Sequence, residues 1–432
     1  MESNLPDNVK GLVRMCRPNL LRLLVFIAFT LPTLPVAVGQ MPGGCPPMPG
    51  IHIPQSGYQA PIIDYYQGQH PDVWQGDQPI ERFLTDLAIR SWARVEYLHY
   101  EFEGPKSFQL GAPVLNAADP LTVADNLNGG LSTGVGVIPT LGPMSLKDIS
   151  GVRGTWGLDL HNADLEVQVF GFGDNDSTFR MTNLQGFRLT GTEATGTVAR
   201  PNVVLPLLSS GAPADAASAN YLIFDESYSA RLRTSMWGAE ATMLTKAYMP
   251  GEGPAWQWLG GFRYLQHNET FSQTGVYNNG GTAADRITQI AGTTVNNLYG
   301  PEIGARASLN HRWFTLSATP RVAFALNDYT ATTTSGPLID PADPVNRVSQ
   351  TEIDFTPIVQ LGLSAQFKIT PNFSIFGGYD FLWMYRLTRP YQNIVYDSEP
   401  DLGGAFVPNI RQGVTHEPFN AKGLNLGFVF QY

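Results

Sequence analysis

A set of ionisable side chains stands on segments in which apolar and polar residues alternate, and these residues are the best candidates for chemistry in this sequence. A hydrolytic site would join Asp with His or Ser with His, a water-filled path would be lined by charges, and a closed interior would pair Arg with Glu. Residue type alone leaves the three alternatives open. The set consists of Arg94, Glu96, Asp159, His161, Glu166, Arg263, His267, Glu269, Glu302, Arg306, Arg321, Asp354 and Asp380.

No motif in the sequence selects the catalytic alternative. The chain has no His-Glu-x-x-His and no Walker loop, and the spacing of His99, His161 and His267 fixes no partner for any of them. The run Asp174-Asn175-Asp176 could hold calcium, but Asp and Asn are also the residues of hairpin turns, and we expect a turn here. The sequence therefore predicts no enzyme, no metal site and no cofactor.

Alternating apolar and polar residues predict β-strands along most of the chain after residue 88. The pattern is longest in residues 353–369, where Phe355 and Val359 share one face and Asp354 and Gln360 share the other. Further strands are expected at 373–383, 312–326, 298–309, 259–271, 91–102, 155–161, 164–172, 180–190, 226–248 and 284–295. These segments predict about 10 to 12 strands, since an even number is usual in bacterial barrels.

The length of these segments favours a barrel in a membrane over a soluble β-sandwich. Several exceed about 12 residues, whereas strands of soluble sheets average about five or six and a strand that crosses a bilayer needs about 9 to 11. The apolar faces also carry aromatic residues near their ends, such as Tyr379, Trp383 and Tyr385, as expected at membrane interfaces. We therefore expect an all-β fold, an antiparallel up-and-down transmembrane β-barrel.

Such a barrel assigns all the ionisable residues named above to its lumen, because a charge on the lipid face costs roughly 2–4 kcal/mol at the midplane. The last ten residues, GLNLGFVFQY, predict a final strand that ends the chain on an aromatic residue. Its Phe428, Phe430 and Tyr432 look like the signal that barrel-assembly machinery recognises in outer-membrane proteins. Outer-membrane lipid and that machinery are therefore the expected partners.

The N-terminus has the layout of a cleaved secretory signal peptide over residues 1–39. The alternative, a membrane anchor helix, is disfavoured because the apolar run 23–38 is shorter than the about 20 residues that span a bilayer and is interrupted by Pro32 and Pro35. Residues 40–87, rich in Pro, Gly and Gln, are expected to form an irregular periplasmic arm, and residues 88–432 the barrel. The expected location is the outer membrane of a diderm bacterium.

Charge and cysteine content exclude other classes of protein. The chain carries 27 Lys and Arg against 37 Asp and Glu, a net charge of −10, without basic clusters, so no nucleic-acid partner is expected. Because Cys16 lies in the predicted signal peptide, Cys45 has no disulfide partner, and Pro42-Gly43-Gly44 before it does not match a lipobox. No apolar run of 18 residues follows the signal, which excludes a helical membrane protein.

Several segments resemble the putative β-barrel porin-7 family, a group of presumed outer-membrane barrels. They are WARVEYLHY (92–100), SGVRGTWGLDL (150–160), LGGFRYLQHNETF (259–271), NNLYGPEIGAR (296–306) and FTPIVQLGLSAQFKITPNFSIFGGYDFLW (355–383). Together they span most of the chain from residue 88 to the end. The resemblance implies a barrel of porin type, but it brings no agreed catalytic or ligand residues to carry over.

We expect a barrel that lets small solutes or ions diffuse across the outer membrane. The alternative is a non-conducting structural or adhesive barrel whose long loops bind partners at the cell surface. Small residues facing inward along all strands would favour the pore, whereas interlocked Arg263, Glu269, Glu302 and Arg306 would favour a closed lumen. The sequence leaves open the solute, the oligomeric state and the role of residues 40–87.

Overall fold

The computed structural model describes residues 85, 87–116, 121–124, 133–182, 202–216, 218–277, 286–338, 345–400 and 406–431. The chain divides into two units, Met1–Gly76 and Asp77–Tyr432, and all the described residues belong to the second. The predicted signal peptide (1–39), nearly all of the predicted arm (40–87), Cys45 and Tyr432 lie outside the described residues. None of the helical residues in the described part forms a helix long and apolar enough to cross a membrane.

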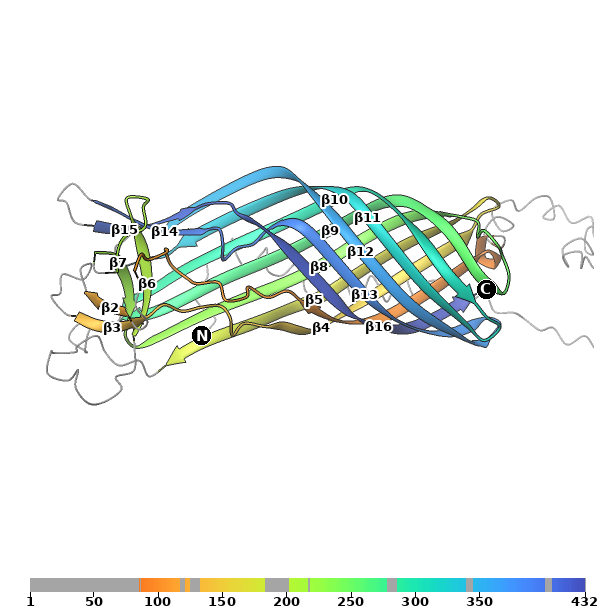
Figure 1. The fold of residues 1–432 in the computed structure, drawn as a ribbon, viewed down its shortest axis with the longest axis horizontal. Coiled ribbons are helices and arrows are strands. Elements are labelled where there is room, and N and C mark those ends of the chain that lie inside the picture. Colours follow the sequence, from red (N-terminus) through yellow and green to blue (C-terminus); the bar gives the residue numbers. More distant parts are fainter. Residues whose placement is uncertain are drawn as a thin grey trace, which may run out of the picture. The chain divides into compact units, whose positions relative to one another are not determined.

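In the described part of the chain, ten antiparallel strands close into one barrel (Figure 1). Each strand pairs with the next barrel strand along the sequence, and the first pairs with the last, with Trp92 opposite Gln431. The predicted up-and-down antiparallel barrel is thereby confirmed. The strands are β1 (Ser91–Phe102), β4 (Leu146–Asp159), β5 (Ala163–Thr182), β8 (Ser227–Thr245), β9 (Gly253–Tyr277), β10 (Arg286–Asn310), β11 (Phe314–Ser335), β12 (Asn346–Thr370), β13 (Phe373–Thr388) and β16 (His416–Gln431).

The turn predicted at Asp174-Asn175-Asp176 is wrong, because these residues lie inside β5. The ladder between β5 and β8 shifts register between Phe172 and Asn175, so the side chains of Asp174 and Asp176 point outward after this bulge. There they form ion pairs with Arg233 and Arg231 of β8, respectively. These cross-strand partners, distant in the sequence, allow two acidic residues to remain in a strand.

The two ends of the barrel differ. At one end, which we call the turn end, short connections join the strands at 160–162, 246–252, 311–313 and 371–372, and β1 begins and β16 ends there. At the other, the loop end, the connections are longer. In Figure 1 a second sheet lies at the loop end, opposite the C-terminus. It consists of β15 (Phe406–Gln412), β14 (Ile394–Pro400), β6 (Asn202–Ser209), β3 (Thr133–Val137) and β2 (Leu121–Ala124), with β7 (Asn220–Phe224) paired to β6.

An apolar belt surrounds the outer face of the barrel on its turn-end half. Along β9 the outward side chains are Trp256, Trp258 and Phe262, all exposed, and beyond Tyr264 they become polar, beginning with Gln266. A belt of about 11 residues matches one bilayer crossing. The remainder of β9, which is 25 residues long, therefore stands clear of the hydrocarbon.

Aromatic residues mark the loop-end edge of this belt with hydrogen bonds. The indole Nε1 of Trp237 donates to Gln266 at 2.8 Å, and the hydroxyl of Tyr264 donates to Asn297 at 3.0 Å. An aromatic ring with one apolar side and one polar tip is suited to the boundary between hydrocarbon and headgroups. The pattern is that of a barrel crossing a membrane, as predicted.

The belt predicts a strong dependence of stability on position along one strand face. Leu361 lies near the middle of the apolar face of β12, while Ser349 lies on the same face beyond the belt. Leu361→Arg is expected to lower the free energy of unfolding by about 2–4 kcal/mol, and Ser349→Arg by no more than about 1 kcal/mol. Urea unfolding in phospholipid vesicles, followed by tryptophan fluorescence, measures both, and equal losses would contradict the position of the belt.

Candidate functional site

The barrel interior is the candidate site, and its composition changes from the turn end to the loop end. Along β1 the inward side chains run from Arg94 and Glu96 to Leu98 and Phe102. Because alternate residues of a strand share one face, these four side chains lie at successive depths of the lumen. The interior therefore has a charged layer nearer the turn end and an apolar region nearer the loop end.

The charged layer contains five arginines and five carboxylates from eight strands. Arg153 joins β1 to β13 across the interior, with Nη2 at 2.5 Å from Glu96 and Nη1 at 2.7 Å from Asp380. Arg263 lies between Glu240 and Glu302, at 2.9 and 3.0 Å from their carboxylate oxygens. The layer consists of Arg94, Arg153, Arg263, Arg306, Arg321, Glu96, Glu166, Glu240, Glu302 and Asp380.

The remaining pairs complete a layer without net charge. Arg306 binds both oxygens of Glu166, each at 2.7 Å, in the bidentate geometry that suits a guanidinium group and a carboxylate. Arg321 lies 2.7 Å from Glu240, and Arg94 lies 2.7 Å from Glu96. Equal numbers of opposite charges in contact need no counter-ions from solution.

In the loop-end half of the lumen, apolar side chains pack together among buried polar residues such as Asn296 and Asn327, and we call this apolar cluster the apolar plug. Leu98, Phe271 and Ile358 project into it from the barrel wall, and Leu141, Leu205 and Tyr391 enter from the connections between strands. None of these six side chains is more than 1% exposed. The connections at the loop end are thus part of the core of the barrel.

A buried ion pair fixes one of these connections in the plug. Arg389, which follows β13, donates from Nε and Nη2 to Glu269 at 2.8 and 2.7 Å and from Nη1 to the carbonyl of Glu103 at 3.0 Å. Both charged side chains are fully buried. The nearby Tyr391 lies outside the membrane belt, and burial raises the pKa of its hydroxyl group. This hydroxyl therefore stays protonated and donates to Glu417.

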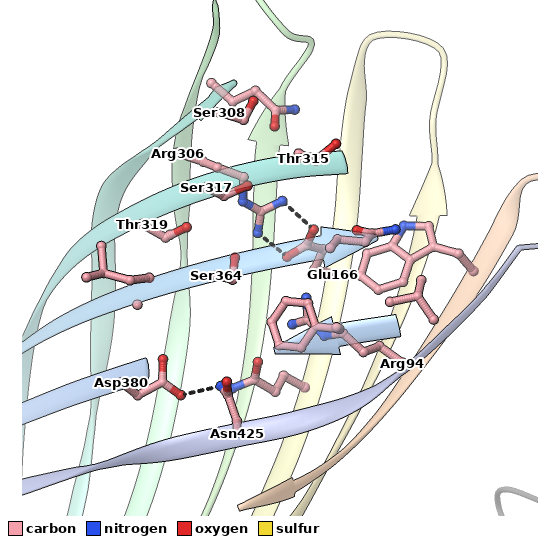
Figure 2. Close-up of a pocket in the computed structure, with 18 of the residues that line it drawn as sticks. Arg94, Glu166, Arg306, Ser308, Thr315, Ser317, Thr319, Ser364, Asp380 and Asn425 are labelled. Carbon is pink, nitrogen blue, oxygen red and sulfur yellow. Dashed lines mark hydrogen bonds and ion pairs between the residues drawn. The ribbon is translucent and has the colours of Figure 1, made fainter. Parts of the chain in front are cut away.

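A polar cavity of about 290 Å³ lies between the charged layer and the turn end. Figure 2 shows Arg306 bound to Glu166 and Asp380 bound to Asn425, with serines and threonines of the neighbouring strands around the same space. The hydroxyl-bearing residues are Ser308, Thr315, Ser317, Thr319 and Ser364. The cavity can hold water or a small polar ligand, and the charged layer closes its inner end.

Most of the predicted lumen residues point into the interior, in two groups. Those in the charged layer are Arg94, Glu96, Glu166, Arg263, Glu302, Arg306, Arg321 and Asp380. His267 and Glu269 are buried in the apolar half, where His267 is in contact with the rings of Phe102 and Phe419. Asp354 is half-buried at 3.3 Å from Arg386 and 3.0 Å from His416, apart from both groups.

Asp159 and His161 depart from the expected position. Asp159 is the last residue of β4, and its side chain is 65% exposed and paired with Lys246. His161 is exposed in the turn that follows. The sequence pattern continued the strand to residue 161, but β4 ends two residues earlier, so these side chains lie at the rim.

The sequence prediction did not include Arg153, Glu240 and Arg389, three charged residues of the interior. Glu240 lies on a predicted strand, where it alternates with the outward Trp237 and Met243, so the alternation could have found it. Arg153 lies on β4 two residues before the predicted strand 155–161, so the strand prediction missed it. Arg389 lies in a connection without periodic pattern, and nothing local in the sequence indicates its burial.

The predicted assembly signal lies on the outer face of β16. Phe428 and Phe430 are exposed to the lipid side and lie against the ring of Phe373 on β13, at centroid distances of 5.7 and 5.4 Å. Tyr432 lies outside the described residues. Within the described part of the chain, no group of three or more His, Cys, Asp or Glu residues could hold a metal ion.

Comparison with known proteins gives one family match. The model of the family described as Putative beta barrel porin-7 matches residues 92–432. The comparison with curated proteins gives no match.

Among solved structures, the chain is similar to the outer-membrane protease OmpT from Escherichia coli, at 10% identity and a TM-score of 0.42, over 79% of this chain and 96% of that one. It is also similar to the translocator domain of the autotransporter NalP from Neisseria meningitidis, at 10% identity and 0.30, over 82% and 92%. A Pseudomonas aeruginosa FadL homologue matches at 9% identity and 0.18, over 79% and 90%. At these values the structures carry no argument about function.

Proposed function

We propose that this chain, which belongs to the Putative beta barrel porin-7 family, is a non-conducting structural barrel of the outer membrane. Its loop end would present a fixed binding surface outside the cell. Bacterial barrels place short turns in the periplasm and long loops outside, which assigns the turn end to the periplasm. The proposal concerns the barrel and its loops, not catalysis, and it takes outer-membrane lipid and barrel-assembly machinery as partners.

The apolar plug is the observation that carries this proposal. A hydrated ion would have to lose its water shell to pass Leu98, Phe271 and Ile358, and a buried charge without a partner is strongly disfavoured. The charged layer lies in series with the plug, and each of its arginines is paired with a carboxylate. Two barriers of opposite chemistry thus follow each other along one lumen.

The space between the two barriers is small. A void of about 30 Å³ lies where Arg153 and Arg263 of the charged layer approach Leu98 and Phe172. This volume corresponds to roughly one water molecule. The geometry therefore favours the closed barrel, which was the alternative in the sequence analysis, over the channel for passive diffusion that was expected first.

The anchoring of the loop-end segments by buried contacts also supports a binding role for the loop end. The side chains of Val203, Val204 and Leu205 on β6 are fully buried, and Asp397 on β14 pairs with Arg411 on β15. Binding to a preformed surface avoids the entropy lost when flexible loops become ordered. Loops held in this way can present one constant surface to a partner.

Single-channel recording tests the proposal. Residues 40–432, refolded and shown to be closed by heat-modifiable gel migration, are expected to give no stepwise current in a planar bilayer. The positive control is one variant that opens both barriers. It replaces Leu205, Leu207 and Tyr391 of the plug by Ser, and it breaks the charged layer with Arg153→Ser and Arg263→Ser. Current through this variant would show that conductance can be detected in the assay. Stable stepwise current from the unaltered barrel would overturn the closed barrel and establish the channel.

A further inference from the structure

The arginines and carboxylates of the charged layer lie at different depths relative to the polar cavity at the turn end. Arg94, Arg306 and Arg321 line the cavity, and their side chains keep 18, 21 and 11% of their exposure. Their partners Glu96 and Glu240 keep 0 and 2%. A molecule that enters the cavity therefore meets guanidinium groups first, although the layer as a whole is neutral.

The two carboxylates that also line the cavity have their charge compensated. Both oxygens of Glu166 are bound by Arg306, at 2.7 Å each. Oδ2 of Asp380 accepts from Tyr100 at 2.6 Å, from Arg153 at 2.7 Å and from Asn425 at 3.0 Å. Neither group presents an uncompensated negative charge to a ligand.

Donor groups remain available on the cavity side. Among the described residues, the contacts of Arg321 use only Nη1, with Glu240 and Glu302, which leaves Nε and Nη2. Arg94 uses Nε and Nη2, which leaves Nη1. Because a guanidinium group carries five N–H donors and keeps its charge at all relevant pH values, these groups can bind an oxyanion.

The position of Arg94 is fixed by an aromatic ring. Its guanidinium carbon lies 4.6 Å from the centroid of the Phe376 ring, and Nε is held by Glu96. An arginine held on two sides loses little conformational entropy when it binds a ligand. The cationic side of the cavity is thus preorganised.

The wall of the cavity between Arg321 and the turn end is uncharged and rich in hydroxyl groups. Thr315, Ser317 and Thr319 follow one another along the inward face of β11, and Ser364 lies on β12 beside them (Figure 2). A hydroxyl group can donate and accept, so this wall suits a ligand that also carries hydroxyl groups. The volume, about 290 Å³, equals that of roughly ten water molecules.

We propose that the polar cavity at the turn end binds a small hydroxylated oxyanion. Its phosphate or carboxylate group would contact Arg94, Arg306 and Arg321, and its hydroxyl groups would contact the serines and threonines of β11 and β12. The inference does not depend on the proposed function, because the cavity and the arginines that line it lie on the turn-end side of the charged layer whether or not the barrel conducts. A sugar phosphate and a sugar acid share this chemistry and fit the volume.

Isothermal titration calorimetry on the refolded full barrel in detergent tests the proposal. The probes are glucose 6-phosphate, gluconate and, as a neutral control, glucose. Binding of either anion without binding of glucose is the expected result, and the anion that binds identifies the group recognised. No binding of any anion at millimolar concentration, or equal binding of glucose, would overturn the proposal.

Two variants and a matched control locate the site. Arg321→Lys keeps a positive charge beside Glu240 but loses Nε and Nη2 as donors, and it is expected to weaken anion binding about tenfold. Arg231→Lys, on the outer face, is the matched control and should leave the affinity unchanged. Thr319→Val preserves shape and should weaken the hydroxylated anions but not inorganic phosphate. Affinities that are the same in all three variants would place the binding elsewhere and overturn the site.

Discussion

Replacing Arg263 with Met is expected to lower the free energy of unfolding of the barrel by about 3–5 kcal/mol. The guanidinium group of Arg263 lies between two carboxylates, at 2.9 Å from Glu240 and 3.0 Å from Glu302, and all three side chains are at most 2% exposed. Without the arginine, two negative charges would remain side by side in a space that water cannot reach. Only Arg321 would remain beside them, at 2.7 Å from Glu240 and 3.7 Å from Glu302, so their desolvation would be only partly compensated.

Urea unfolding in vesicles, with heat-modifiable migration as a check on closure, measures this loss. The matched control is Arg231→Met, which removes an arginine from an exposed ion pair with Asp176 on the outer face and should cost no more than about 1 kcal/mol. A companion variant, Arg263→Met with Glu302→Gln, should recover part of the loss because one of the two charges is also removed. If Arg263→Met costs no more than the control, the charged layer does not stabilise the barrel.

The second large effect is expected where the barrel closes on itself. Gly427 on β16 pairs with Glu96 on β1, and a Cβ atom at Gly427 would lie 2.1 Å from the carbonyl oxygen of Val95 and 2.8 Å from the Cα of Glu96. These are backbone atoms, which cannot rotate away. Gly427→Ala is therefore expected to cost about 3 kcal/mol, the upper part of the usual range for overpacking.

Gly154→Ala is the control for this substitution. Gly154 pairs with Val95 from the other neighbour of β1, and a Cβ atom there would meet nothing within 4 Å. Its replacement should leave stability unchanged or raise it by up to about 1 kcal/mol, since glycine weakens a strand. Equal behaviour of the two variants in the unfolding assay would mean that the close approach of β16 and β1 does not limit the barrel.

The filled lumen couples the barrel wall to the loop end. In a water-filled channel the loops can move without disturbing the wall, whereas here Arg389 and Tyr391 from one connection are packed among wall residues. Substitutions in the plug are therefore expected to alter the surface at the loop end. A partner that binds the loop end would in turn stabilise the barrel against unfolding by mass action.

In the strands with clear alternation, the sequence by itself determined which side meets lipid and which faces inward. In residues 353–369 every second side chain is apolar, and β12 carries these side chains on its exposed outer face. The same alternation indicated the inward position of Arg263, Glu302 and Arg306. Alternation is a local property, because successive residues of a strand point to opposite faces wherever the strand lies.

Strand ends and the turn at Asp174-Asn175-Asp176 were less accessible to sequence reasoning. Asp, Asn and Gly are typical of turns, and only the arginines of β8 decide that Asp174 and Asp176 stay in β5. Similarly, the end of β4 at Asp159 depends on its neighbours in the barrel. A preference of residue type is weak compared with the contacts that a complete barrel supplies.

Only the tertiary structure decided which charges meet and what closes the lumen. Arg153 contacts Asp380, 227 positions away in the sequence, and Arg389 contacts Glu269 at a separation of 120. Such contacts depend on strand register and on the path of the connections across the interior, neither of which alternation records. The sequence thus specified a barrel with charges inside, and the packing of its connections determined that the lumen is filled and that arginines face the remaining cavity.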